Sequence, residues 1–312
     1  TAHDLRTEYI MRLGVAATPE VAIPTLEWLH SSKHAIKLII TQPDKPSGRG
    51  RVLTQTPVAD WAERHKIEVV KPASSTELNG VIDNLDCVIT IGYGVLLPQA
   101  VLDLPRHGFL NLHFSLLPQY RGAAPAQYAL LHGVEKTGVT VFQLDKGMDT
   151  GPIFSQIEVG IDPQWRSFEL LKVLAERGVE AVDQALEMIA QEKSPTAQTG
   201  TPSFAPKISK QDALIDFTKD SVTVVNAIRA YTYEPGAWSL WNSEPFKVSA
   251  AISAQAHPLS PSTIAVINNC VFVGCGNGTT IELLRVVPAG KKEMAAIDWA
   301  RGARLNGGES FG

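Results

Sequence analysis

The side chains best suited to chemistry lie in one short apolar segment near the middle of the chain. Asn111 and His113 stand two residues apart in the sequence Asn-Leu-His-Phe-Ser-Leu-Leu-Pro at 111–118. Because side chains alternate between the two faces of a β-strand, we expect Asn111 and His113 to share a face, with Leu112 on the other. An amide and an imidazole at one strand end can together stabilise an oxyanion and transfer a proton.

A carboxylate that can assist this imidazole follows on a glycine-flanked segment. Asp149 lies in the sequence Asp-Lys-Gly-Met-Asp-Thr-Gly at 145–151. A nearby carboxylate can hold the tautomer of an imidazole and favours its protonated form. Each polar residue alone would also fit a buried group satisfied by the backbone, but the two segments together are more specific. We therefore predict that Asn111 and His113 stabilise an oxyanion, that His113 also handles a proton, and that Asp149 orients and charges His113.

Both segments resemble the folate-dependent formyltransferase family. The resemblance runs from residue 11 to about residue 299, and its motifs lie at 17–20, 41–50, 115–125 and 288–292. The second and fourth of these motifs are the narrower ones and favour the members that act on methionyl-tRNA. The resemblance implies formyl transfer from 10-formyltetrahydrofolate, without a metal, to the α-amine of methionine on initiator tRNA, in support of translation initiation.

Formyl transfer to an amine sets three requirements. The amine must be unprotonated, the formyl carbonyl must be polarised, and the leaving nitrogen must receive a proton. The resemblance assigns these tasks to the same three residues, Asn111, His113 and Asp149. Phe114 stands where relatives commonly have Gly, and we expect its side chain to face away from His113, into packing.

The folate donor is expected to bind between two loops that follow predicted strands. Gly92 and Gly94 let a flat ring approach backbone amides closely, and neighbouring leucines give apolar walls. The residues alone fit an ordinary turn equally well, and the resemblance favours the folate site. The predicted folate-binding residues are Ile91, Gly92, Tyr93, Gly94, Leu96, Ser115, Leu116, Leu117 and Pro118. No Gly-x-Gly-x-x-Gly follows the first predicted strand, which disfavours a nicotinamide cofactor.

Basic residues in three segments predict contacts with RNA. The loop at 44–51 is cationic and contains glycine, which suits phosphate and base contacts, although such a loop is also typical of a plain solvated surface. The resemblance implies that this loop enters the end of the tRNA acceptor stem, with Arg49 as its main contact. The predicted tRNA-binding residues are Lys45, Arg49, Arg51, Lys207, Lys210, Lys291 and Lys292. Together they predict a steep salt dependence of acceptor binding.

The first two thirds of the chain alternate short apolar runs with helical patterns. This alternation predicts an α/β fold with a doubly wound, mostly parallel, Rossmann-like sheet. The predicted strands are 13–17, 36–41, 67–70, 87–92, 109–114 and 139–144, and the predicted helices are 21–31, 57–66 and 167–192. Such sheets bind ligands beyond the carboxyl ends of their strands, where Asn111 and His113 are expected.

A stretch rich in Thr, Gly, Pro and Ser separates this pattern from a second one. One helix at 222–231 and short strands at 237–240, 246–249, 263–267, 271–274 and 280–285 follow it, which fits a small β-barrel or a sandwich. The resemblance implies a barrel of the oligonucleotide-binding type. We expect a non-native leader at 1–10, a formyltransferase catalytic domain at 11–197, a linker at 198–211, and a smaller C-terminal β-barrel, tRNA-binding domain at 212–312.

The composition is typical of a soluble globular enzyme. The 312 residues are 44% hydrophobic and 19% charged, and the net charge of −4 argues against non-specific coating of nucleic acid. Cys87, Cys270 and Cys275 are expected to be reduced core thiols, and no cysteine or histidine spacing suggests a metal site. The chain lacks a long apolar run and a signal-peptide pattern, so we expect a cytoplasmic protein, and the absence of a coiled-coil pattern favours a monomer.

Two other functions stay open. A sugar-nucleotide N-formyltransferase would keep Asn111, His113 and Asp149 but would have little use for the basic loop at 44–51. A catalytically silent folate- or RNA-binding module would have no use for the three polar residues.

Overall fold

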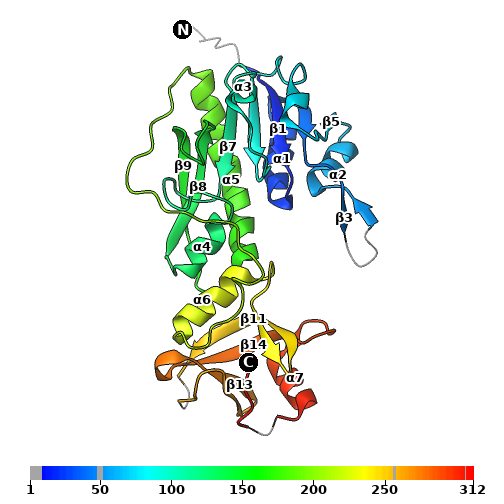
Figure 1. Cartoon of the computed structure of the whole chain (residues 1–312). Helices are drawn as coiled ribbons and strands as arrows, with labels where there is room; N and C mark the ends of the chain where they lie inside the picture. Colours follow the sequence, from blue (N-terminus) through cyan, green and yellow to red (C-terminus); the bar gives the residue numbers. More distant parts are fainter. Residues whose placement is uncertain (1–8, 48–51, 256–257, 306) are drawn as a thin grey trace. The chain divides into compact units, whose positions relative to one another are not determined.

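The computed structural model describes residues 9–47, 52–255, 258–305 and 307–312 (Figure 1). The chain divides into two compact units, each described here by itself. The first unit contains Thr1–Pro125, Thr137–Gly160 and Leu171–Phe204, and the second contains Ala126–Lys136, Ile161–Leu170 and Ala205–Gly312. Within the described ranges, the helices are all too short or too polar to cross a bilayer.

The first unit is built on a seven-stranded sheet in the order β5-β2-β1-β6-β7-β8-β9 (Figure 1). The first five strands in this order run parallel to one another, whereas β8 runs antiparallel to β7. The predicted α/β class with a mostly parallel sheet is therefore confirmed. The strands are β1 Arg12–Ala17, β2 Ala35–Ile40, β5 Val69–Val70, β6 Cys87–Ile91, β7 Phe109–His113, β8 Lys136–Gln143 and β9 Ile153–Gly160.

Two strand features were not predicted from the sequence. The last strand, β9, alternates buried and exposed residues from Ser155 to Gly160, which is the pattern of a half-buried strand. Two short strands flank the basic loop and pair as an antiparallel hairpin: β3 Lys45–Ser47 and β4 Val52–Thr54. The residues between these two strands, including the predicted Arg49 and Arg51, lie outside the described part of the chain.

Short helices connect the strands, and a long helix, α5, follows β9. Local signals explain their starts: Pro57 occupies the first turn of α2, and the Thr56 hydroxyl caps that helix by accepting a hydrogen bond from the Ala59 amide. The helices are η1 Glu20–Ala22, α1 Ile23–Ser31, α2 Pro57–Arg64, η2 Ser75–Leu78, α3 Gln99–Leu102, α4 Pro125–Leu131 and α5 Ser167–Ala190.

One apolar core reaches from the sheet to the loop that follows β6. Ala16, Ile40 and Val88 on the strands pack in one cluster with Tyr93 and Leu97 of that loop. The buried core therefore fixes the loop, because moving its side chains would expose apolar surface to water.

Helix α5 packs closely on β7 through a glycine. A Cβ atom at Gly178 would lie 2.6 Å from Cδ2 of Leu112, and the Leu112 side chain is buried. Leu112 lies between Asn111 and His113 in β7. Its packing against α5 therefore fixes how closely the helix approaches the strand that carries both polar residues; Figure 1 shows the two elements.

The second unit contains a six-stranded antiparallel sheet, in which β15 pairs with β14 beside the path β10-β11-β14-β13-β12. Two register shifts in β11, between Val248 and Ala251, bend the sheet. This curled sheet is consistent with the predicted small barrel, and the oligonucleotide-binding type stays a prediction. The elements are α6 Ser221–Tyr231, β10 Trp238–Trp241, β11 Glu244–Ala254, β12 Ile264–Ile267, β13 Cys270–Gly274, η3 Gly276–Gly278, β14 Thr280–Val287, β15 Met294–Ala295 and α7 Ala296–Ala303.

Replacing Gly178 with Ala is expected to lower the free energy of unfolding. Alanine adds about 1 kcal/mol of helix propensity, but a methyl group forced into a packed contact costs about 1–3 kcal/mol. The net loss is therefore up to about 2 kcal/mol, to be measured by urea unfolding. Gly302 in α7 is the matched control, because a Cβ there meets no atom within 4 Å. If Gly178→Ala proved as stable as Gly302→Ala, the contact with Leu112 would not limit the packing.

Candidate active site

A cavity of about 510 Å³ opens in the first unit at the carboxyl ends of β6 and β7. Its volume lies in the range of about 300–1,000 Å³ that is usual for small-molecule sites. Asn111, His113 and Asp149 all line it, as the sequence predicted for residues that act together. The other lining residues are Thr90, Gly92, Tyr93, Gly94, Val95, Leu96, Leu97, Leu102, Leu112, Phe114, Gly122, Ala123, Pro125, Leu144, Asp145, Gly147 and Met148.

Thr90 of the neighbouring strand orients the amide of Asn111. The Thr90 hydroxyl donates its hydrogen to the Leu110 carbonyl at 3.0 Å, so it can only accept from the Asn111 amide, whose Nδ2 lies 2.9 Å away. This arrangement settles which way the amide points. The second Nδ2 hydrogen has no partner among the described residues and can serve a bound molecule.

His113 is buried, and a backbone carbonyl fixes its tautomer. Nε2 lies 2.9 Å from the Tyr120 carbonyl oxygen, which can only accept, so Nε2 carries the hydrogen. The other nitrogen, Nδ1, is then the one that can accept a proton, and it lies 3.9 Å from Oδ2 of Asp149. The structure thus gives the tautomer-fixing contact to Tyr120, whereas Asp149 contributes charge.

Burial and charge act in opposite directions on this imidazole. Burial lowers the pKa of His113 below its usual 6.5, and the Asp149 carboxylate and the Tyr120 carbonyl partly offset this by raising it. The balance keeps His113 neutral near pH 7, with a free lone pair on Nδ1. A neutral imidazole of this kind can act as a general base.

Asp149 is held by backbone groups in an unusual conformation. Its Oδ2 accepts a hydrogen bond of 2.7 Å from the amide of Gly122. Its φ of 52° lies in the left-handed region, which residues other than glycine rarely adopt. Neighbouring Thr150 and Gly147 both donate to Oδ1 of Asp145, which closes the turn before Asp149.

The predicted folate-binding residues fall into two groups. Gly92, Tyr93, Gly94 and Leu96 line the cavity, whereas Ile91 and the four residues at 115–118 are absent from its lining. The latter four form a supporting turn, in which the Ser115 hydroxyl donates to the Gln119 carbonyl at 2.5 Å and the Leu117 amide donates to Oγ1 of Thr140 at 3.1 Å.

Glycine is required at one of these positions. Gly92 has a φ of 57°, and a Cβ there would lie 2.6 Å from Cγ of Pro19. The left-handed backbone and the contact with Pro19 therefore both require glycine here, and a folate contact at this point stays a prediction.

Phe114 follows β7 directly and is buried, as expected, but it also lines the cavity. The Phe114 side chain thus adds to the apolar wall beside His113. Sequence reasoning did not single out Leu102, Leu144 or Met148, which complete this wall from α3 and from the loop after β8. No periodic pattern marks Leu144 and Met148, because both stand among polar and glycine residues.

Gln42 joins the glycine loop to the start of the basic hairpin. Its Nε2 donates to the Tyr93 carbonyl at 2.9 Å, and its Oε1 accepts from Nζ of Lys45 at 2.6 Å. Lys45 is exposed, so its charge stays accessible at this end of the sheet.

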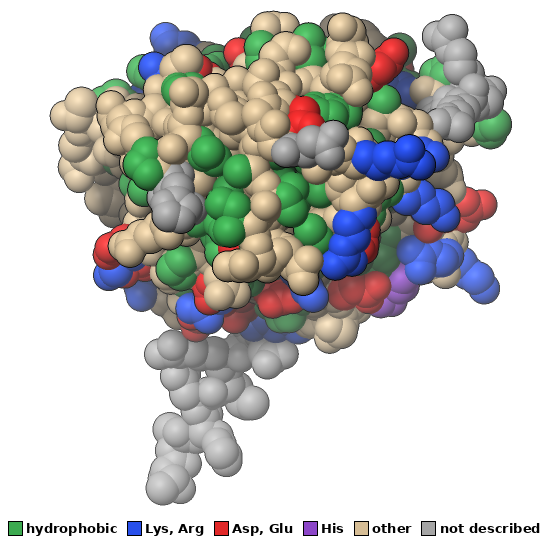
Figure 2. Space-filling model, turned by 90° about the horizontal axis from the view of Figure 1, so that it is seen from below, with side chains coloured by type: hydrophobic (Ala, Val, Ile, Leu, Met, Phe, Trp, Pro, Cys, Tyr) green, Lys and Arg blue, Asp and Glu red, His purple; other side chains and the backbone are tan. Residues whose placement is uncertain are grey.

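Four of the predicted basic residues lie in the second unit. Lys207, Lys210, Lys291 and Lys292 are all exposed, and Nζ of Lys210 lies 5.4 Å from the ring centre of Trp238. Figure 2 shows several Lys and Arg side chains at the right edge of one face, with Asp and Glu side chains among them, beside a largely uncharged centre. Their role in binding RNA stays a prediction.

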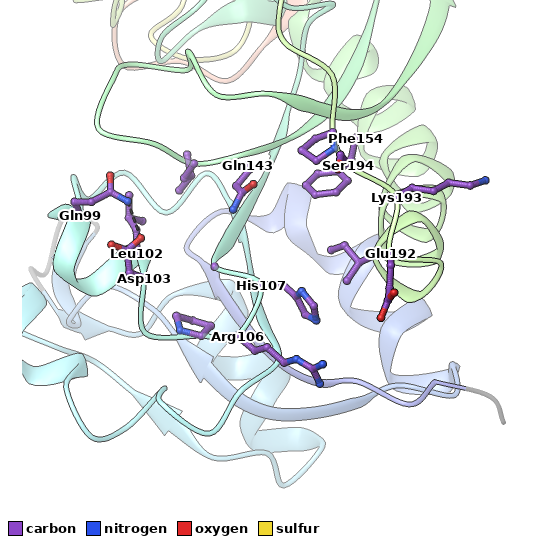
Figure 3. A pocket seen from close by; sticks show the side chains of 15 residues that line it. Gln99, Leu102, Asp103, Arg106, His107, Gln143, Phe154, Glu192, Lys193 and Ser194 are labelled. Atoms are coloured by element: carbon purple, nitrogen blue, oxygen red, sulfur yellow. Dashed lines mark hydrogen bonds between the residues drawn. The ribbon is translucent and has the colours of Figure 1, made fainter.

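A second cavity of about 490 Å³ lies at the amino end of β7 (Figure 3). Arg106, His107 and Lys193 line it together with the carboxylates of Asp103 and Glu192. His107 is thus separated along the strand from His113, and it offers a histidine outside the candidate site for comparison.

The described residues contain no group of three or more His, Cys, Asp or Glu side chains placed to hold a metal ion. The cysteines are free, and burial raises the pKa of the Cys87 thiol to about 12 and that of Cys275 to about 11. Thiols with such pKa values are poor nucleophiles at neutral pH. Asn111, His113 and Asp149 stay the predicted catalytic residues, and Thr90, Tyr93 and Asp145 line the same cavity.

Comparison with known proteins matches two family profiles to the chain. The family described as "Formyl transferase" matches residues 12–186, and "Formyl transferase, C-terminal domain" matches residues 207–304. A protein of Thermobifida fusca (strain YX) named methionyl-tRNA formyltransferase is 42% identical over 311 residues, which cover 97% of this chain and 99% of that protein. A protein of the same name from Salinispora tropica is 42% identical over 308 residues, covering 96% and 99%.

Among solved structures, HypX from Aquifex aeolicus in complex with tetrahydrofolic acid has a similar fold. The TM-score is 0.65 at 18% sequence identity, and the match covers 97% of this chain and 49% of HypX, so this chain spans about half the length of HypX. With two matching family profiles and full-length relatives at 42% identity, the chain belongs to the formyltransferase family.

Proposed function

We propose that this protein transfers a formyl group from 10-formyltetrahydrofolate to the α-amine of methionine on initiator tRNA. The names of the full-length relatives support this activity. The observation that carries the proposal is the joint placement of the Asn111 amide, Nδ1 of His113 and the Asp149 carboxylate on one cavity. These are the donor, the base and the counter-charge that formyl transfer needs.

The cavity suits a folate donor, which would present an electrophilic formyl carbon there. Tyr93, Leu97, Leu102 and Phe114 give it apolar walls, and Gly92 and Gly94 also line it. Such walls with a few convergent polar groups are typical of small-ligand sites.

The side chains then act in a fixed order. The free Nδ2 hydrogen of Asn111 donates to the oxygen that becomes negative when the amine attacks the formyl carbon and a new C–N bond forms. Nδ1 of His113 accepts the proton that the attacking amine loses, and it returns this proton to the nitrogen that leaves when the old C–N bond breaks. The Asp149 carboxylate stabilises the imidazolium between these two steps by Coulomb attraction.

The exposed lysines support an RNA acceptor. Raising the salt concentration is expected to weaken acceptor binding steeply, because each lysine–phosphate contact displaces a counterion. The Lys45→Ala variant should reduce the slope of log affinity against log salt by about 1, measured by filter binding of methionyl initiator tRNA. Lys193→Ala is the control, since Lys193 lies at the second cavity. A salt slope unchanged by Lys45→Ala would remove Lys45 from the RNA contacts.

One assay tests the proposed function directly. Purified protein and 10-formyltetrahydrofolate are mixed with methionyl initiator tRNA, methionyl elongator tRNA or an amino-sugar nucleotide, and formylated product is measured. We expect turnover with the initiator tRNA above the other two acceptors. A preference for the amino-sugar nucleotide would instead indicate that the protein is a sugar-nucleotide N-formyltransferase. No turnover with any acceptor would indicate that it is a catalytically silent binding module.

We keep the division into a catalytic domain at 11–197, a linker at 198–211 and a tRNA-binding barrel at 212–312 as a proposal. We also propose that the protein acts as a cytoplasmic monomer. Size-exclusion chromatography with light scattering would test the monomer.

A further inference from the structure

Gln198 lies after α5, within the first unit, and reaches the loop that carries Asp149. Its Nε2 donates hydrogen bonds to two backbone carbonyls of that loop, 2.8 Å to Asp149 and 2.9 Å to Gly151. Both amide hydrogens are thus used on either side of Thr150. One half-buried side chain therefore fixes the backbone on both sides of the turn that presents the carboxylate.

The other end of the same side chain holds the second support of Asp149. Oε1 of Gln198 accepts a hydrogen bond of 2.7 Å from Nη2 of Arg121. Arg121 precedes Gly122, whose amide donates to Oδ2 of Asp149. Gln198 thus links the segment that carries the carboxylate to the segment that binds it.

The residues after Gln198 extend this support to the partner of His113. Oγ of Ser203 accepts from the Tyr120 amide at 2.9 Å, and the Ser203 carbonyl accepts from the Arg121 amide at 2.9 Å. The Tyr120 carbonyl in turn holds Nε2 of His113. The segment at 198–203 therefore braces both neighbours of the imidazole.

We propose that Gln198 is a positioning residue, which holds the Asp149 backbone so that the carboxylate stays beside Nδ1 of His113. Asp149 needs such help, because its left-handed backbone persists only where surrounding contacts over-determine it. The proposal rests on the proposed function for its effect on turnover. It also makes a prediction for the protein without substrates.

The test compares Gln198→Met and Gln198→Ala with the parent and with Gln191→Ala. Methionine keeps the volume and the neutral charge of glutamine but cannot form these hydrogen bonds, so it guards against a packing defect in the alanine variant. Gln191 is exposed at the end of α5 and bonds to Glu187. Thermal unfolding first confirms that each variant folds.

The substrate-free measurement is an NMR titration of His113. The influences on its pKa are burial, Asp149 and the Tyr120 carbonyl, and Arg121 keeps its charge in every variant. Because Asp149 raises the pKa, releasing its carboxylate should lower it. We expect Gln198→Met and Gln198→Ala to shift the pKa of His113 downward, toward that of an Asp149→Asn reference, and Gln191→Ala to leave it unchanged.

Turnover gives the second measurement. A misplacement of about 1 Å near the chemistry costs up to about 100-fold in rate, so kcat of the two Gln198 variants should fall about 10- to 100-fold. The acid limb of the kcat profile should move to lower pH together with the pKa of His113. Variants that fold but keep the parental pKa of His113 would overturn the proposal. If the parent protein were inactive toward methionyl initiator tRNA, that result would refute the proposed function. The titration of His113 would then still test the role of Gln198 by itself.

Discussion

Replacing Asn111 with Ala is expected to lower kcat by about 100- to 1,000-fold. The Thr90 hydroxyl orients the amide and leaves the second Nδ2 hydrogen to donate, in the proposed mechanism, to the oxygen that becomes negative. Alanine removes this donor and leaves a small gap that water can fill, so the fold should remain intact. The measurement is single-turnover formylation of methionyl initiator tRNA, with circular dichroism to check folding.

A smaller change at the same place provides the control for Asn111. The Thr90→Ser variant keeps the hydroxyl that orients the amide, and its kcat should remain within a few-fold of the parent. If a folded Asn111→Ala protein retained near-normal turnover, the oxyanion would be stabilised elsewhere.

Replacing His113 with Ala is expected to lower kcat by about 100- to 10,000-fold, the usual contribution of general acid–base catalysis. In the proposed mechanism the base is the neutral imidazole, so the parental rate should fall as the pH falls through the pKa of His113. Burial holds this pKa below the usual 6.5, which places the acid limb of the profile below that value. In the His113→Ala variant, kcat should be low and should no longer fall with decreasing pH in this range.

His107→Ala is the matched histidine control. His107 lines the second cavity at the amino end of β7, and burial also lowers its pKa (Figure 3). Its replacement should leave kcat and the acid limb unchanged. An acid limb that survives in His113→Ala would show that another group takes the proton.

The centre of the candidate site could be predicted from the sequence because its geometry is local. Asn111 and His113 share a face through strand alternation alone, and the α/β pattern places their strand end where such sheets bind ligands. Asp149 was predicted from a second motif, and the structure places its Oδ2 3.9 Å from Nδ1 of His113.

The supports of the site could not be predicted, because their partners lie far away in the sequence. Gln198 and Ser203 lie in a stretch whose Thr, Gly, Pro and Ser residues are typical of a linker. Their partners at 120–121 and 149–151 are roughly 50 to 80 residues away. Polar loop residues carry no periodic signal that would announce such a contact.

The hydrogen bonds between residues 118–122 and 198–203 determine where this chain can be cut or recombined. A fragment that stops at residue 197 would lose Gln198 and Ser203, and with them the acceptors of the Tyr120 and Arg121 amides. A fragment that continues through Phe204 would keep every one of these bonds. Chimaeras that exchange the C-terminal third of the chain between relatives should therefore be joined beyond Phe204.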